Sequence, residues 1–423
     1  MLPPKPNEAL SREFFKPENI ACPFETWRKL RQECPVPYMQ APGGGSGAFL
    51  ITRKEDVEYV SQHPEIFTSE VTADVWRWGN DLPPELMKII DEQGGYKIVH
   101  TIVTSDPPRS ALYRRIAIEA LSVGKVNARA GAIQSIIDEL IANIPDDTPI
   151  DFREKFAVPL PLRVILDLFG LPREDSQFVY DCTCAIIHMV DPITPIDEAK
   201  PSLMQVIAGQ KYLAQRIEKY RETPEDNFLS YVANARNNDG ALLSMEEAIS
   251  VAFITMIGGN ETTRNALSSM AYELARDPNM WRRLQADESL IPVFIEEAVR
   301  QGSPATLTPR QVAQDTELNG TPMPKGAPVY VLWASGSHDE RYFEDANTIR
   351  LDRTNGRQHT SFGFGVHHCA GVHLARKELE MSLRAWLKAF ESMEFAVPQE
   401  DVLFAPSFGV RQLYALPLRL KRK

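Results

Sequence analysis

Hydrophobic residues recur three and four positions apart along most of the chain, a spacing that predicts long helices. Two segments depart from it. VPYM and AFLIT, on either side of the glycine-rich residues 41–47, predict two short strands joined by a hairpin turn. A second strand-rich region is expected from about residue 312 to residue 333, where glycine and proline supply turns. The pattern predicts a mainly α fold with small β-sheets (α+β), formed by one large domain over residues 1–423.

The longest predicted helix begins after Ser244 and ends where Asp277-Pro278 interrupts the pattern. Ser244 and Glu247 fit a capping box, and the helix should extend for roughly 50 Å. Gly258 and Gly259 lie at mid-length, each costing about 1 kcal/mol relative to alanine, and four polar residues follow them. A long helix that is most flexible and most polar at its centre indicates a functional site there.

Cys369 lies in a glycine-rich segment, FGFGVHHCAG, at residues 362–371. Its glycines permit tight turns and a close approach of the backbone to a flat ligand. The apolar residues that follow have helical spacing, so Cys369 should precede a helix N-terminus, where the helix dipole and free N–H groups favour a thiolate. The alternative is a small hydrophobic cysteine in a turn.

This segment resembles the haem-binding loop of the bacterial cytochromes P450, F-x-x-G-x-H-x-C-x-G. The resemblance implies that the chain binds haem b (iron protoporphyrin IX) and that the Cys369 thiolate is the axial ligand of the iron. It also implies that Phe362, Gly365, His367 and Gly371 shape the loop around the cofactor.

A second similarity to the family is the E-x-x-R motif formed by Glu297 and Arg300. At i,i+3 on a helix the two side chains share a face and can pair. In the family this pair is structural and is joined by a downstream arginine. Arg353 is the candidate for that third member, although the residues around it depart from the usual F-D-x-x-R pattern.

Residues 258–263 resemble the oxygen-binding stretch of the same family. The resemblance implies that Gly258 and Gly259 leave a notch above the iron, and that Glu261 and Thr262 are catalytic and deliver protons for oxygen activation. The alternative is that the Thr262 hydroxyl bonds back to a helix carbonyl and that Glu261 pairs with a lysine.

The resemblance implies that Arg114, Arg310 and His367 hold the haem propionates, a role that suits arginine because its planar fork binds a carboxylate through two hydrogen bonds. Arg114 follows Asp106-Pro107-Pro108 as in the family, but Ser110 stands where histidine is common. One propionate contact is therefore missing or supplied differently. A solvated basic face is the alternative for Arg114.

Composition narrows the class of partner. The chain has 46 basic and 57 acidic residues, a net charge of −11 that disfavours nucleic acid or an anionic membrane as the main partner. No segment reaches the roughly 20 apolar residues of a membrane span. The five cysteines are scattered without a CxxC pair, so neither a disulfide framework nor a zinc site is expected. This pattern of cysteines predicts a cytoplasmic enzyme.

The resemblance implies a monooxygenase that uses O2 to hydroxylate a hydrophobic small molecule, such as a terpenoid, steroid, lipid or aromatic compound. Since no flavin or iron–sulfur domain is expected in the chain, electrons should come from an iron–sulfur ferredoxin and its NAD(P)H-dependent reductase. The alternative is a haem-binding sensor or a catalytically silent family member.

Two further expectations concern surfaces. Substrate contacts are expected from Trp76 and Trp78 in the loop at about residues 71–95, and from Ala305, Leu307 and Phe408. The ferredoxin is expected to dock on residues 107–130, where the only acidic residue is Glu119 and the basic residues are Arg109, Arg114, Arg115, Lys125 and Arg129.

Overall fold

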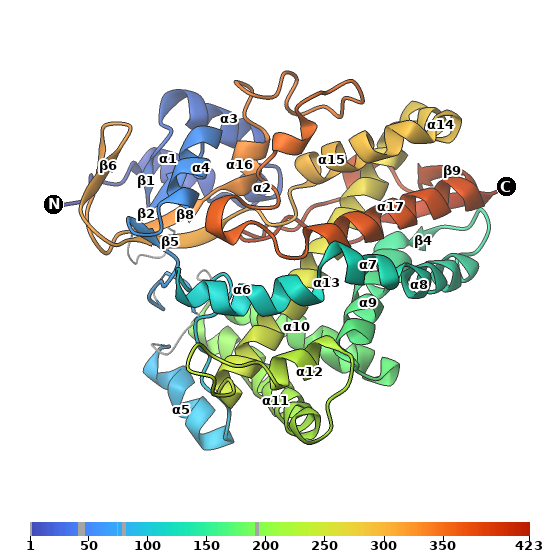
Figure 1. Ribbon diagram of the computed structural model, residues 1–423. Coiled ribbons are helices and arrows are strands. Elements are labelled where there is room, and N and C mark those ends of the chain that lie inside the picture. The colour runs from blue at the N-terminus through green and yellow to red at the C-terminus, as the bar shows by residue number, and fades with distance from the viewer. Residues whose placement is uncertain (1, 41–46, 74, 78–81, 191–193) are drawn as a thin grey trace.

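The structure, a computed structural model, describes residues 2–40, 47–73, 75–77, 82–190 and 194–423. Helices make up most of it, and the strands lie mainly at one side (Figure 1). The helices are α1 (Glu8–Phe14), α2 (Pro17–Ala21), α3 (Phe24–Glu33), α4 (Lys54–Gln62), α5 (Pro84–Gln93), α6 (Arg109–Ala120), α7 (Val123–Ala128), α8 (Ala130–Ala142), α9 (Pro159–Phe169), α10 (Ser176–Val190), α11 (Ile196–Glu222), α12 (Phe228–Ala233), α13 (Met245–Arg276), α14 (Pro278–Ala286), α15 (Ile291–Gly302), α16 (Trp333–Ser337) and α17 (Val372–Ala389).

The strands form three small sheets, in the orders β1-β2-β8-β5-β3, β4-β10-β9 and β6-β7. In the largest sheet only β2 and β8 run parallel to each other. The strands are β1 (Tyr38–Met39), β2 (Ala48–Ile51), β3 (Phe67–Thr68), β4 (Ile150–Asp151), β5 (Thr308–Val312), β6 (Thr316–Leu318), β7 (Thr321–Met323), β8 (Pro328–Val331), β9 (Phe390–Phe395) and β10 (Pro417–Arg422).

The mainly α architecture with small sheets is therefore confirmed. The two strands predicted around the glycine-rich stretch pair antiparallel, with Tyr38 opposite Phe49. The turn between them, residues 41–46, lies outside the described residues. The second strand-rich region is also found, but it begins four residues earlier than expected, at Thr308.

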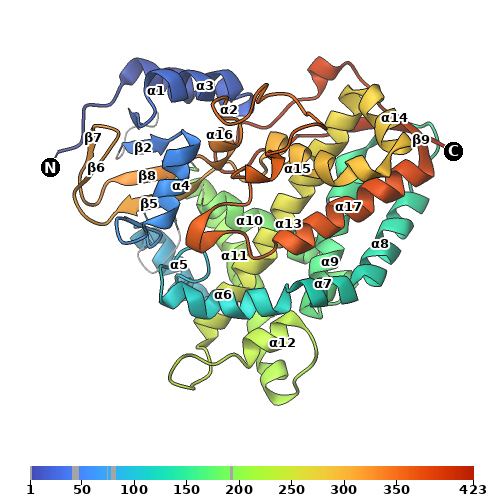
Figure 2. The same ribbon diagram turned by 45° about the horizontal axis from the view of Figure 1, so that its top comes forward.

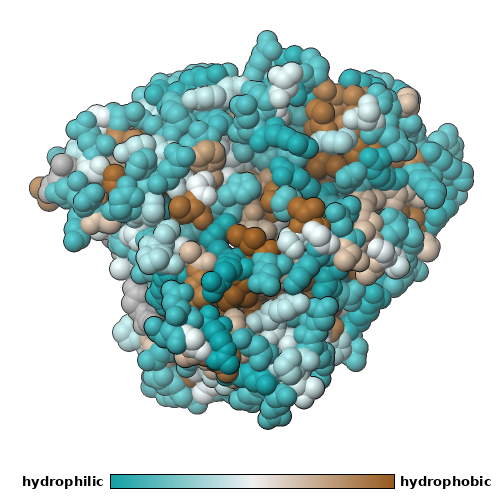
Figure 3. Space-filling view, viewed as in Figure 1, coloured by the Kyte–Doolittle hydropathy of each residue, from teal (hydrophilic) through white to brown (hydrophobic). Residues whose placement is uncertain are grey.

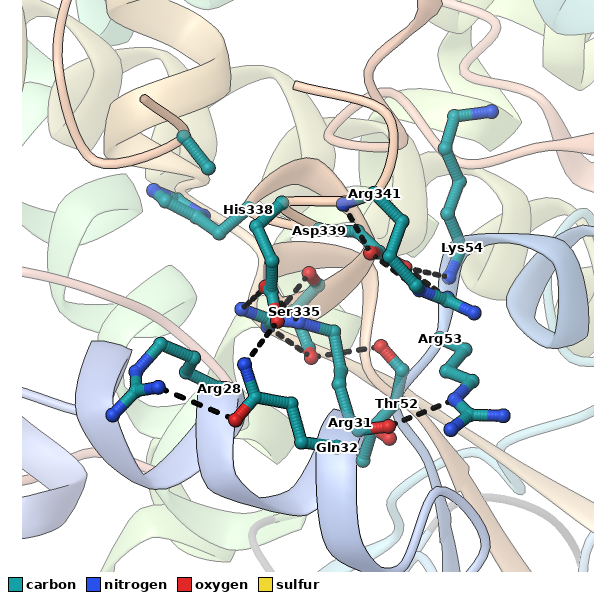
Figure 4. Close-up of polar contacts among 12 residues, drawn as sticks. Arg28, Arg31, Gln32, Thr52, Arg53, Lys54, Ser335, His338, Asp339 and Arg341 are labelled. Carbon is teal, nitrogen blue, oxygen red and sulfur yellow. Dashed lines mark hydrogen bonds and ion pairs between the residues drawn. The ribbon is translucent and has the colours of Figure 1, made fainter. Parts of the chain in front are cut away.

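The N-terminal helices α1 and α3 lie along the largest sheet, as Figure 2 shows. Phe14 and Trp27 from these helices share a hydrophobic cluster with Leu50 and Tyr330 from the sheet. A polar cluster then joins α3 to α16 (Figure 4): the buried Arg31 donates to the carbonyl and hydroxyl oxygens of Ser335, at 3.1 and 2.9 Å. This end of the molecule is thus fixed by both apolar and polar contacts.

Helix α13 extends through the middle of the molecule, with α6 and α17 on one side of it (Figures 1 and 2). The predicted capping box is present: Ser244 Oγ accepts from the Glu247 N–H at 3.1 Å, and Glu247 Oε2 accepts from the Ser244 N–H at 2.9 Å. Glu247 also accepts from the Tyr113 hydroxyl at 2.6 Å, which joins α6 to the start of α13. Among the described helices, none is both long and apolar enough to cross a bilayer.

The E-x-x-R pair is fully buried on α15. Arg300 Nε lies 2.7 Å from Glu297 Oε1, and Arg353 Nε lies 2.9 Å from the other carboxylate oxygen of Glu297. Arg300 also donates to the carbonyl oxygens of Ser337, Ala346 and Thr348. All three side chains therefore form one ion cluster that holds the segment between α16 and the cysteine loop.

Candidate active site

A cavity lies between α13 and the loop that carries Cys369, with about 1410 Å³ of empty space when the solvent at its open mouth is included. Helices α6, α9 and α17 complete its walls. Most of the wall is apolar, and Thr262 of α13 shares it with the Cys369 thiol. The glycine-rich loop and the polar centre of the long helix, which the sequence singled out separately, thus face one chamber.

The cysteine loop turns through two glycines with left-handed backbone, Gly363 (φ 70°) and Gly365 (φ 66°). Its Cys369 N–H donates to the Phe362 carbonyl at 2.8 Å. A Cβ at Gly365 would lie 2.5 Å from the Ser61 carbonyl oxygen, so this glycine lets the loop approach α4. Phe362, Gly363 and Gly371 line the cavity, whereas Gly365 faces α4 rather than the space a cofactor would fill.

The Cys369 thiol is half-buried, since part of its surface faces the cavity. Burial raises the pKa of this thiol, and the Gly371 N–H together with the Arg114 and Arg376 guanidinium groups offsets only part of the increase. The stabilisation of the Cys369 thiolate by the helix N-terminus, which the sequence led us to expect, is therefore incomplete. A coordinated metal cation would deprotonate a thiol held in this way.

One end of the cavity carries three basic side chains, Arg114, Arg310 and His367. Neither arginine forms an ion pair with any residue that the structure describes. Burial lowers the pKa of Arg310 to about 10, although Asp106 opposes this effect. Buried cations are normally paired, so this end of the cavity fits a ligand edge with negative charge, as the two propionates of haem b would provide.

His367 is neutral in this arrangement. Burial, followed by the charges of Arg310 and Arg114, lowers the pKa of its imidazole to about 3. Its Nδ1 donates to the Ile102 carbonyl at 3.1 Å, and its Nε2 accepts from the Ser69 hydroxyl at 3.0 Å. Ser110, which occupies the position where the family often has histidine, is buried and lies away from the cavity wall.

The two central glycines of α13 have different surroundings. A Cβ at Gly258 would meet no atom within 4 Å, whereas a Cβ at Gly259 would lie 2.4 Å from Ile165 Cδ1 of α9. Gly258 therefore leaves open space in the cavity, as expected from the sequence. Gly259 also lines the cavity, but helix packing against α9 explains why it lacks a side chain.

Thr262 and Glu261 adopt the arrangement that the sequence analysis gave as the alternative. The Thr262 hydroxyl donates to the Gly258 carbonyl at 2.6 Å. Glu261 is buried away from the cavity wall and pairs with Arg264, at 2.5 Å, instead of with a lysine. The i,i+3 spacing of Glu261 and Arg264 was the signal in the sequence that could have predicted this pair.

The expected substrate contacts have four different outcomes. Ala305 lines the cavity, whereas Leu307 and Phe408 pack into the hydrophobic cluster under α1 and α3. Trp76 lies beside Gly409, and no described residue of 71–95 reaches the cavity wall. Trp78 lies outside the described residues. Apolar side chains absent from the sequence-based expectation line the chamber instead, among them Ile102, Val103, Ile165, Leu168 and Ile254.

Comparison with known proteins adds an independent observation. Residues 202–412 match the family model described as Cytochrome P450. The chain is 34% identical to a methyl-branched lipid omega-hydroxylase of Mycobacterium tuberculosis (strain CDC 1551 / Oshkosh), with 84% of this chain and 81% of the relative covered. It is 30% identical to linalool 8-monooxygenase of Pseudomonas putida, with 85% and 86% covered. The chain belongs to the cytochrome P450 family.

The solved structure of CYP108D1 from Novosphingobium aromaticivorans superimposes on this P450 with a TM-score of 0.85, at 25% identity and with all of both chains covered. Cytochromes P450 use haem b with an axial cysteine thiolate. The protein is a monooxygenase of this family, since its relatives are named as hydroxylases and monooxygenases. Those names favour the enzyme over the haem-binding sensor considered from the sequence.

The contrast between the two glycines yields a test of helix packing. Alanine should be tolerated at Gly258, where it gains up to about 1 kcal/mol of helix propensity. Alanine at Gly259 should lower the free energy of unfolding by about 1–3 kcal/mol, because its Cβ overlaps Ile165. Denaturant unfolding of the two haem-loaded variants measures the difference. Ile165→Val, which removes Cδ1, should restore stability to Gly259→Ala; equal stability of the two alanine variants would contradict the packing argument.

Proposed function

We propose that this P450 hydroxylates a hydrophobic small molecule of the branched-lipid or terpenoid class, with O2 and with electrons from an external iron–sulfur ferredoxin. The observation that carries the proposal is the shared chamber. The Cys369 thiol, the Thr262 hydroxyl and the basic side chains of Arg114, Arg310 and His367 all face one apolar space. Haem b bound through a thiolate supplies the electron density that favours cleavage of the O–O bond.

The residues of the chamber support specific roles. Cys369 would ligate the haem iron through its sulfur, and Arg114, Arg310 and His367 would hold the propionates. Neutral His367 would donate to a propionate only after taking up a proton, since its Nε2 accepts from Ser69 here. Bound carboxylates next to the imidazole would raise its pKa and favour that change.

We propose that Thr262 passes protons into the cavity and that Glu261 supplies them. The Thr262 hydroxyl needs only to rotate away from the Gly258 carbonyl to donate toward the cavity. Glu261 must first separate from Arg264, because the ion pair occupies one carboxylate oxygen and the residue does not line the cavity. The other carboxylate oxygen is buried and has no hydrogen-bond partner among the described residues. The Glu261–Arg264 pair would then be the resting state of the proton path.

The substrate class rests on the wall and on the relatives. Ile102, Ile254 and Leu168 give the chamber an apolar lining suited to hydrocarbon. One relative is named for methyl-branched lipids and another for linalool, which is a terpenoid. Steroids and aromatic compounds remain the comparison classes for the test below.

The electron donor is proposed to dock over α6 and α7. Arg109 and Arg115 are exposed there, as are the apolar side chains of Ile118 and Val123. Figure 3 shows hydrophobic residues gathered near the centre of this face. An apolar centre with basic surroundings suits an acidic ferredoxin. All five cysteines are unpaired, which supports a cytoplasmic location, where such donors and reduced thiols occur together.

The first functional prediction concerns haem ligation and substrate. The reduced, CO-bound protein should show the red-shifted Soret band of thiolate ligation, and Cys369→His should bind haem without it, while the control Cys22→Ser keeps it. The same wild-type protein should show substrate-induced spectral shifts with branched lipids and terpenoids at lower concentrations than with steroids or aromatic compounds. Haem-loaded wild-type protein without the band would refute the assignment of Cys369.

Thr262→Ala should keep substrate binding and NADH consumption but divert electrons to hydrogen peroxide. We expect product formed per NADH to fall by about tenfold or more, since a positioned proton donor contributes ~10²–10⁴ in rate. Thr255→Ala is the matched control, because its hydroxyl makes the same bond to a helix carbonyl, at 2.8 Å. If Thr262→Ala forms as much product per NADH as wild-type protein, Thr262 is not part of the proton path.

Charge reversal tests the docking surface. Arg109→Glu with Arg115→Glu should slow reduction by an acidic ferredoxin roughly tenfold at low salt and flatten its salt dependence. Lys125 is a poorer probe than the sequence suggested, because its ammonium lies over the Tyr231 ring. Arg282→Glu on α14 reverses an exposed charge elsewhere and should leave the rate unchanged. Equal rates for wild type and the α6 double variant would disprove docking there.

A further inference from the structure

Glu378 on α17 is a buried carboxyl group that the proposed reaction does not use. Its side chain lines the cavity, and only 1% of the residue is exposed. Its Oε2 has no hydrogen-bond partner in the part of the chain that the structure describes, and no described cation pairs with it. A carboxyl group in such a position costs stability, so its protonation state and its effect on the cavity need an explanation.

Most groups that line the cavity with Glu378 are apolar, among them Ala117 of α6, Leu121, which directly follows α6, and Ala266 of α13. The other charged and titratable members of the wall are Arg114, Arg310, His367 and Cys369.

Burial alone raises the pKa of Glu378, to about 8. No charge on α6, α13 or α17 contributes to this increase. The group is therefore neutral at neutral pH, and it is sensitive to any new charge placed in the same water-poor chamber.

Two further buried polar groups follow this carboxyl group on α17. Ser382 and Trp386 follow Glu378 at four-residue intervals on one face of the helix, and both are fully buried. The Ser382 hydroxyl and the Trp386 indole nitrogen also have no partner among the described residues. Buried polar atoms of this kind are commonly satisfied by internal water.

We propose that Glu378 is a redox-linked proton site, which in alkaline solution takes up one proton when the haem in this cavity takes up one electron. The inference rests on the proposed function, because it requires haem bound at Cys369. The donor supplies the electron, which reduces iron from the ferric to the ferrous state. Solvent supplies the proton, which forms an O–H bond on the Glu378 carboxylate, so the charge added to the chamber is balanced.

The direction of the coupling follows from electrostatics. Reduction adds one negative charge to the haem, and a nearby negative charge raises the pKa of a carboxyl group. Between the pKa values of the oxidised and reduced states, the midpoint potential must therefore fall as pH rises. Each pH unit is a tenfold change in proton concentration, so the slope can reach about 59 mV for this one-electron couple.

Spectroelectrochemical titration of the haem-loaded protein across a pH series tests the proposal. Wild-type protein and Glu378→Gln should have the same potential well below pH 8. Above it, the wild-type potential should fall below that of the variant, which stays neutral. Glu380→Gln is the matched control: it makes the same change two residues away on α17, in a carboxylate that pairs with Arg384 at the surface. The midpoint potential of Glu380→Gln should have the same pH dependence as that of wild-type protein.

Two measurements keep the outcomes separate. If the CO-bound spectrum lacks thiolate ligation in wild-type protein, the proposed function fails and this inference fails with it. If ligation is normal but Glu378→Gln and wild type share one pH dependence, only this inference is overturned. If Glu378→Gln does not fold, the infrared difference spectrum of wild-type protein decides: above pH 8, reduction should produce a carboxylic acid C=O band that shifts in D2O, and its absence would overturn the proposal.

Discussion

The ion pair between Glu297 and Arg300 is completely buried, and the segment that leads to Cys369 depends on it. Arg300 has five donors, and it uses them on the Glu297 carboxylate and on three backbone carbonyls between α16 and the cysteine loop. Removing Glu297 would leave two buried arginines without their carboxylate, and loss of a buried ion-pair partner typically costs about 3–5 kcal/mol, whereas removing Arg300 would leave Glu297 paired with Arg353 alone. The pair thus specifies the path of a long, mostly irregular segment whose regular structure is limited to short 3-10 turns.

The neighbouring glutamate connects the same helix to the other side of the loop. Burial would raise the pKa of Glu296, but hydrogen bonds from His359 and Arg376 outweigh it and bring the pKa to about 2. Arg376 belongs to α17, and its guanidinium lies 4.9 Å from the centre of the Phe362 ring. Two consecutive residues of α15 therefore hold both flanks of the cysteine loop, and the position of Cys369 follows from them.

Local patterns were sufficient to predict the fold class, the capping box of α13 and the partners within E-x-x-R, because each depends on residues close in sequence or on a specific motif. Contacts between segments that are distant in sequence could be predicted less well. Leu307 and Phe408 were assigned to the substrate pocket, yet they pack with α1 and α3, because hydrophobicity alone does not say which cluster a side chain joins. Gly259 similarly owes its identity to Ile165, which is nearly a hundred residues away.

The basic end of the cavity has a consequence for the life of the protein in the cell. Arg114 and Arg310 form no ion pair with any described residue, and Asp106 offsets only part of the burial cost of Arg310, so this end of the cavity is stabilised further when an anionic ligand binds. A ligand that binds only the folded form raises its stability by mass action. The haem-loaded chain should therefore resist unfolding and proteolysis better than the haem-free chain.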